Sequence, residues 1–409
     1  MSPWRWWVAL SALAVVLGWW SAQTLSSADS HDQPSVSFAS ATEAASAGNP
    51  PLGAFQGNAG PLGARQPAKP EVLALWRSRL ERAEMTLASY REATRYPFSA
   101  RPLTEQPDQA FPYQPIQEER AFRLPQGQVM PGLTLKTTQD RVHIQAQESV
   151  TVTVAAVNDK GKPLPLSIQR AWAHEGGRGQ QASHPHFANV AFRDDGLEAD
   201  QLAGDGIHTA VIAPTRMGFA ELAGTLRVEV SMQAQWGESD QPGYAYFDVV
   251  THPELAAEWL AGAQDRMDQG SLVFELPLQV HKAGRYVVTG RVDGANGKPF
   301  ALLTFNEELP RGKQLVRMTL FGKMVRDLKP KFPLKLRDVQ AFRLVPDSFP
   351  DRVMLPADQA PIVVSGHYPF LSFSDTEWQS EERSRYLAEY SKDVLEAQEQ
   401  LRHLQGNSP

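Results

Sequence analysis

The chain has 409 residues, a formal net charge of −6 and a sequence pI near 6.0. This length exceeds what one hydrophobic core normally organises, so we expect about two or three domains. The acidic balance leaves no excess of lysine and arginine to neutralise phosphates, so we predict that the protein does not bind nucleic acid. Cysteine is absent, which excludes disulfides, thiolate nucleophiles and cysteine-ligated metal centres.

The N-terminus carries an export signal. Arg5 precedes an uncharged apolar run over residues 6–20, and residues 26–28 are the small residues that a signal peptidase reads. Tryptophans at both ends of the run are also typical of a spanning helix that remains as a membrane anchor. Residues 1–28 are therefore a signal peptide or a signal anchor. In both cases the body of the protein is exported, to the periplasm or, as a less favoured alternative, the cell surface.

Residues 29–69 are rich in Ser, Ala, Gly, Gln and Pro, which predicts a disordered linker. An amphipathic helix is expected over residues 70–92, where apolar residues recur at spacings of three and four and Pro70 suits the first turn. Repeated prolines then favour an extended strap up to residue 132, because proline excludes helix and confines strands to sheet edges.

Beyond residue 133 the apolar period changes to two. Alternation over residues 150–156 and 226–233 is typical of half-buried strands, and about seven such segments before residue 252 match an immunoglobulin-like sandwich. A second series of alternating segments follows over residues 253–373. We expect a short helix at 254–264 between the two.

A capping-box sequence at 374–377 predicts the start of a C-terminal helix, whose apolar residues again recur at spacings of three and four. The two helices, 70–92 and 378–404, could pack on each other or on a sandwich. Alternatively, they could form the seam of an oligomer.

The predicted fold class is mainly β, with two tandem immunoglobulin-like β-sandwiches flanked by N- and C-terminal amphipathic helices. The predicted parts are a signal peptide or anchor (1–28), a linker (29–69), a helix and strap (70–132), two sandwiches (133–252 and 253–373) and a C-terminal helix (374–409).

The sequence also resembles a known group of exported proteins. The motif at 194–196, followed by 203–209, resembles the DDG…AGDGIYT turn signature of bacterial exported immunoglobulin-like modules, with His208 in place of the usual tyrosine. The second sandwich is similar to the β-domain of proteins called choice-of-anchor X. That likeness rests on residues 96–102, 284–286, 297–299 and 309–312. It implies an exported sandwich protein and supplies no catalytic residue.

An acidic loop is the first candidate site. Asp194, Asp195, Asp200 and Asp205 could supply enough oxygens for a structural calcium ion, although their spacing does not match an EF-hand loop. The alternative is a set of tight turns, in which glycine supplies positive φ and aspartate caps its own backbone. No other cofactor is predicted.

A histidine loop is the second candidate. His174, His184 and His186 could present imidazoles to zinc or copper, but no carboxylate pattern nearby completes a metal site. The sequence has no Gly-x-Ser-x-Gly, His-Glu-x-x-His or Walker motif, so we predict that the protein is not an enzyme. The alternative is an enzyme, or a metal-dependent enzyme subunit, with its site in loop 194–206 or loop 174–186.

Aromatic residues are the third candidate, because exposed rings on a sheet face could stack on sugars. The residues concerned are Trp172, Trp236, Trp259, Trp378, Tyr244 and Tyr246. β-Sandwiches on a tether can present binding surfaces and loops without carrying a catalytic site. We therefore predict a non-enzymatic envelope protein, linked to the membrane by its N-terminal segment, that binds or helps assemble an envelope protein or glycan.

Overall fold

The computed structural model describes residues 69–109, 111–124, 127–176, 186–357 and 360–406. The predicted export signal and all of the predicted linker except Lys69 lie outside the described residues, as does His184. Within the described ranges, no helix combines the length and the apolar character needed to cross a membrane.

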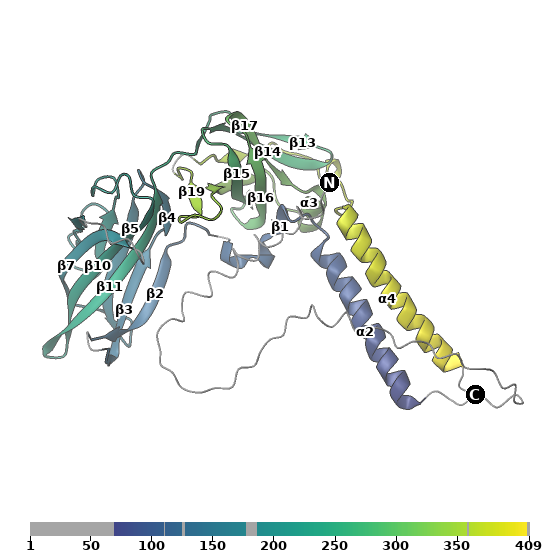
Figure 1. The fold of residues 1–409 in the computed structure, drawn as a ribbon, viewed down its shortest axis with the longest axis horizontal. Helices are drawn as coiled ribbons and strands as arrows, with labels where there is room; N and C mark the ends of the chain where they lie inside the picture. The colour runs from purple at the N-terminus through teal and green to yellow at the C-terminus, as the bar shows by residue number, and fades with distance from the viewer. Residues whose placement is uncertain (1–68, 110, 125–126, 177–185, 358–359, 407–409) are drawn as a thin grey trace, which may run out of the picture. The chain divides into compact units, whose positions relative to one another are not determined.

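The first sandwich consists of two five-stranded sheets (Figure 1). One contains β2 (Ile116–Arg123), β3 (Val129–Gln139), β5 (Val150–Asn158), β6 (Pro163–Leu164) and β9 (His208–Ile212). The other has the order β4-β11-β10-β7-β8, formed by His143–Gln145, Ser239–His252, Gly224–Trp236, Leu166–Gly176 and Phe187–Asn189. The predicted alternation is confirmed, because Val152 of β5 and Val228 of β10 are fully buried in one shared core.

The second sandwich has its own core, in which Phe274 and Tyr286 are fully buried. Its larger sheet contains β1 (Ala100–Pro102), β15 (Gly284–Asp293), β16 (Pro299–Leu309), β18 (Lys335–Leu344), β19 (Arg352–Met354) and β20 (Val363–Val364). The other contains β12 (Ala257–Trp259), β13 (Gln264–Asp268), β14 (Ser271–Val280) and β17 (Gly312–Leu320), followed in the chain by α3 (Gly322–Leu328). The mainly β, two-sandwich fold is thus confirmed.

The strap is shorter than predicted. Its first part contributes β1 to the second sandwich and contains the short 3-10 turns η2 (Leu103–Glu105) and η3 (Pro107–Gln109). The Tyr113 hydroxyl then donates to the Val339 carbonyl of β18 at 3.0 Å. From Ile116 onward the chain is strand β2 of the first sandwich, so the expected boundary at residue 133 is wrong. Among the described strands, β2 pairs with β3 alone, which makes it the edge strand that the prolines predict.

Both flanking helices form, but only the N-terminal helix begins where the sequence predicts. Helix α2 (Pro70–Ala93) begins at proline, as predicted. Helix α4 (Glu381–Gly406) begins later than the capping box at 374–377, because the Ser380 hydroxyl accepts the Arg383 N–H at 3.0 Å and caps the helix. The short helix expected at 254–264 is wrong: β12 occupies this segment, since Trp259 pairs with Leu278 in a ladder.

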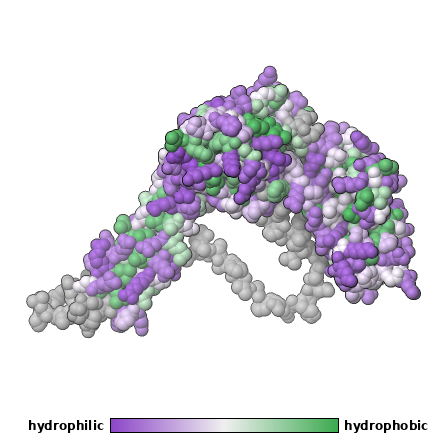
Figure 2. Space-filling view, turned by 180° about the vertical axis from the view of Figure 1, so that it is seen from behind, coloured by the Kyte–Doolittle hydropathy of each residue, from purple (hydrophilic) through white to green (hydrophobic). Residues whose placement is uncertain are grey.

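Helices α2 and α4 lie side by side and antiparallel (Figure 1). The Tyr90 ring near the end of α2 lies 5.2 Å from the Tyr390 ring near the start of α4, and Glu84 meets Gln398 further along. The space-filling view shows apolar residues along the pair (Figure 2). The expectation that the helices pack on each other is confirmed, and an oligomer through them stays a prediction.

Candidate binding face

The outer side of the β7–β10–β11 sheet carries a group of exposed aromatic and charged residues, here called the aromatic face. Because Val228, Val230 and Phe247 point into the core, their neighbours along each strand point outward. The strand register aligns these outward residues in three rows. The rows are Tyr244–Ser231–Arg170, Tyr246–Glu229–Trp172–Asn189 and Asp248–Arg227–His174–Phe187.

Three aromatic rings of the face are open to solvent. The exposed fractions are 50% for Tyr244, 45% for Tyr246 and 56% for Phe187, whereas Trp172 is half-buried. Large exposed aromatic residues that share one face of a sheet are typical of an interaction site, because burying them against a partner stabilises a complex.

Two arginines lie against these rings. The Arg227 guanidinium lies 4.6 Å from the Tyr246 ring centre and donates to both oxygens of Asp248, at 2.8 and 2.7 Å. The Arg170 guanidinium lies 3.6 Å from the Trp172 ring centre. Hydrogen bonding to Asp248 raises the pKa of Arg227 further above its ordinary value. Arg227 therefore stays charged, and both arginines present planar donor groups beside the rings.

Glu229 lies in the middle row of the face and contacts a residue of the neighbouring row. Its carboxylate lies 3.3 Å from Nε2 of His174. Burial and the neighbouring Glu229 carboxylate raise the pKa of Tyr244 to about 12, so the phenol keeps its proton at neutral pH. These mutual contacts fix the side chains before any ligand arrives, which lowers the entropy cost of binding.

Of the six aromatic residues selected from the sequence, Trp172, Tyr244 and Tyr246 come together on the face. Trp236 packs against the first core and Trp259 against the second, while the backbone N–H of Trp378 donates to Arg95. Phe187 is the member that sequence reasoning missed. Its strand, β8, has three residues, which is too short to give a periodic signal.

The acidic loop brings together three of its four candidate ligands. One carboxylate oxygen from each of Asp194, Asp200 and Asp205 lies within 4.8 Å of the others. Asp195 does not join them, because it accepts from Arg193 at 3.0 Å and from the Leu197 N–H at 3.1 Å. No histidine of the described residues belongs to this cluster.

The three clustered carboxylates already accept backbone N–H groups. Asp194 accepts from Gly204 at 2.7 Å, Asp205 at 3.1 Å and Gly206 at 3.1 Å. Asp200 accepts from Gly196 at 2.6 Å. These bonds close turns in which Gly196, Gly204 and Gly206 have φ between +73° and +81°. Calcium takes six to eight oxygens, so three carboxylates alone would not fill its coordination, and a structural calcium ion stays a prediction.

Two residues of the predicted histidine loop, His174 and His186, lie within the described residues, on either side of the segment 177–185, which lies outside them. His174 lies on strand β7 within the aromatic face. The His186 Nε2 atom lies 2.9 Å from the Met217 carbonyl, and its ring lies 4.8 Å from that of Phe219. His174 and His186 therefore each have their own partners. The arrangement of these two does not support a shared metal site.

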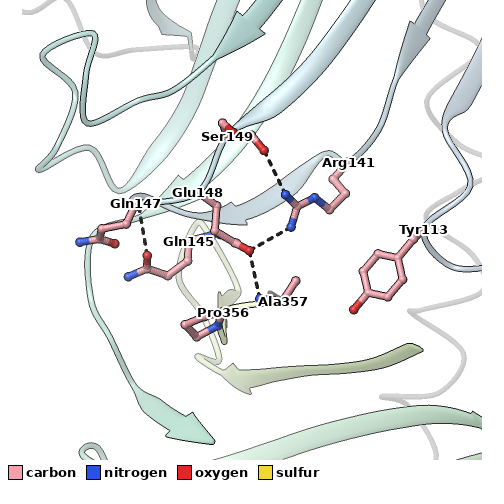
Figure 3. A pocket seen from close by; sticks show the side chains of 8 residues that line it. All are labelled: Tyr113, Arg141, Gln145, Gln147, Glu148, Ser149, Pro356 and Ala357. Atoms are coloured by element: carbon pink, nitrogen blue, oxygen red, sulfur yellow. Dashed lines mark hydrogen bonds and ion pairs between the residues drawn. The ribbon is translucent and has the colours of Figure 1, made fainter. Parts of the chain in front are cut away.

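A cavity of about 580 Å³ lies where the β4–β5 turn approaches residues 356–357 (Figure 3). Its charged residues bind each other: Glu148 accepts from Arg141 at 3.0 Å and from the Ala357 N–H at 3.0 Å. Arg141 also donates to the Ser149 carbonyl at 3.0 Å. Burial raises the pKa of Tyr113, which lines the cavity, to about 12. These contacts hold the lining groups to one another and to the backbone.

The chain matches no protein-family model and no curated protein sequence. Among solved structures it is similar to a DUF4785 family protein from Legionella pneumophila, at 14% identity and a TM-score of 0.36, over 52% of this chain and 54% of that one. The chain thus spans about half the length of that protein.

Two further likenesses are weaker. Salmonella alpha-2-macroglobulin gives 11% identity and a TM-score of 0.22, over 58% of this chain and 17% of that one. The Escherichia coli adhesin FdeC gives 16% identity and a TM-score of 0.18, over 54% of this chain and 63% of that one. At these scores no function is transferred from the neighbours to this chain.

Proposed function

We propose that this is a non-enzymatic exported envelope protein whose first sandwich binds another envelope component through the aromatic face. The observation that carries the proposal is the combination of exposed Tyr244, Tyr246 and Phe187 with an ordered set of charged partners. Binding sites are enriched in tyrosine, tryptophan and arginine. The aromatic side chains bury much area and lose little rotamer entropy, and arginine supplies several planar donor groups.

Export is supported by the sequence of the N-terminus. The uncharged apolar run at 6–20 behind Arg5 is typical of a signal peptide or anchor, and the resemblance to choice-of-anchor X proteins implies the same compartment. The proposed location is the periplasm, either free or held at the inner membrane. The N-terminal mass of protein isolated from envelopes tests this. An intact Met1 means an anchor, a start near Asp29 means cleavage, and recovery of the protein only from the cytosol refutes export.

Co-sedimentation of the full-length protein with isolated envelope fragments tests the binding face. We expect the wild type to sediment with the fragments and a Tyr244→Ala/Tyr246→Ala variant to bind at least about tenfold more weakly. The control is Phe98→Ala, which removes an aromatic ring that is 65% exposed but lies outside the face.

Both variants should keep the wild-type circular dichroism spectrum, because all three side chains are exposed. If the double variant binds as tightly as the wild type, the aromatic face is not the binding site and the proposal is wrong.

A further inference from the structure

We infer that the ligand of the aromatic face is an uncharged polysaccharide chain. This inference rests on the proposed function and names the chemical class of the component bound. It follows from the charge of the face, from the kinds of apolar side chain on it and from the spacing of its rings.

The charges of the face cancel. The Arg227 guanidinium is bound by Asp248, and Glu229 lies beside His174 while Arg170 lies on Trp172. A face selective for phosphate or for a polyanion would need a surplus of arginine or lysine, and a face selective for a basic partner would need a surplus of carboxylates. A ligand without net charge forgoes no electrostatic attraction on this surface. Its hydroxyl groups can donate hydrogen bonds to the carboxylates and accept them from the arginines.

The exposed apolar area of the face is aromatic. The ring-bearing positions Tyr244, Tyr246, Trp172 and Phe187 are interleaved with polar side chains, and the three rows contain no Leu, Ile, Met or Val. The centres of protein–protein interfaces are desolvated and well packed. A face of separate rings with a charged or polar neighbour beside each suits a sugar better, because a pyranose has an apolar C–H side and hydroxyl groups around its edge.

The spacing of the rings fits an extended chain. Tyr244 and Tyr246 are two residues apart on β11 and so about 7 Å apart along the strand. A chain crossing the strands along the middle row would meet Tyr246, Glu229 and Trp172 in turn, at intervals of about 5 Å. Ring and hydrogen-bonding groups thus alternate across the strands along the middle row, and two rings follow one another along β11.

The test compares envelope fragments treated in two ways, one sample digested with protease and the other oxidised with periodate, which cleaves vicinal diols of sugars. We expect the full-length protein to sediment with the protease-treated fragments as with untreated ones, and to lose at least about tenfold in affinity for the oxidised ones. Raising the salt concentration should leave the affinity nearly unchanged, since no net charge is neutralised.

Binding that survives periodate but is lost after protease digestion, and that still depends on Tyr244 and Tyr246, would overturn the glycan inference and leave the proposed function standing. Binding that is strongly reduced by salt would also overturn it, in favour of a charged ligand. If Tyr244→Ala/Tyr246→Ala has no effect on any sample while Phe98→Ala behaves as the wild type, both the inference and the proposed function fail.

Discussion

Acidification should destabilise the protein through His143. This residue lies on β4, and burial, followed by the positive charge of Arg352, lowers its pKa to about 4 against the opposing effect of Asp351. The ordinary value is 6.5. Because the folded state holds the imidazole neutral, the unfolded chain takes up the proton first. The contribution is complete above pH 6.5 and is lost as the pH falls from 6.5 towards 4.

The size of the effect follows from the lowered pKa. Each unit between the two pKa values corresponds to about 1.4 kcal/mol, so the full contribution is about 3 kcal/mol. About 2.5 kcal/mol of it should already be lost near pH 4.5. His252, whose pKa burial also lowers, changes stability in the same direction.

The assay is urea unfolding followed by tryptophan fluorescence at about pH 7.5 and about pH 4.5, for the wild type and for His143→Gln. Glutamine stays neutral throughout, so the variant should lose about 2 to 3 kcal/mol less than the wild type over this interval. Carboxylates that do not interact with His143 contribute to both proteins and cancel in the difference, whereas Asp351 interacts with His143 and cancels only in part. Equal losses in the two proteins would refute the reasoning.

Three further changes test the packing and the loops. Tyr286→Phe removes a fully buried hydroxyl that lies 2.7 Å from the Lys282 carbonyl and 3.0 Å from that of Ala256, and should lower the free energy of unfolding by about 1 to 2 kcal/mol in urea titration. Gly243→Ala would drive a methyl group into the buried Phe122 ring and should cost about 2 to 3 kcal/mol, whereas Gly406→Ala, with nothing within 4 Å, should leave the urea midpoint unchanged. Asp194→Ala frees three backbone N–H groups and should cost about 1 to 3 kcal/mol without calcium present. If turn closure is the role of these carboxylates, adding calcium will leave the melting temperature of the wild type unchanged, and a rise that Asp194→Ala abolishes would instead establish the calcium site.

The local pattern of the sequence determined most of the elements. Period-two alternation in β5 and β10 predicted strands with one buried side, and proline at residue 70 with apolar spacings of three and four predicted α2. These signals are readable because the side chains of one segment alternate between core and solvent regardless of which strand lies beside them. The acidic loop was also predictable as turns, since its glycines and aspartates act within the loop itself.

The tertiary structure decided which segments that are distant in the sequence pair with one another. Residues 254–264 have a helix-compatible sequence, but Trp259 pairs with Leu278 in a strand ladder. Residues 116–123 extend the first sandwich because β3 offers an edge, and Ser380 caps α4 in place of the earlier capping box. Such choices depend on which backbone groups find partners across space, and sequence spacing does not report them.

The aromatic face shows both contributions together. The sequence by itself determined that Tyr244 and Tyr246 point to one side of their strand and that Trp172 lies on another strand. Only the register of β11 on β10 and of β10 on β7 placed Tyr246, Glu229 and Trp172 in one row, and only the pairing of β7 with β8 added Phe187. Alternation fixes the side on which a residue lies, whereas its neighbours are set by long-range hydrogen-bond register, because a shift of one residue would turn every ring into the core.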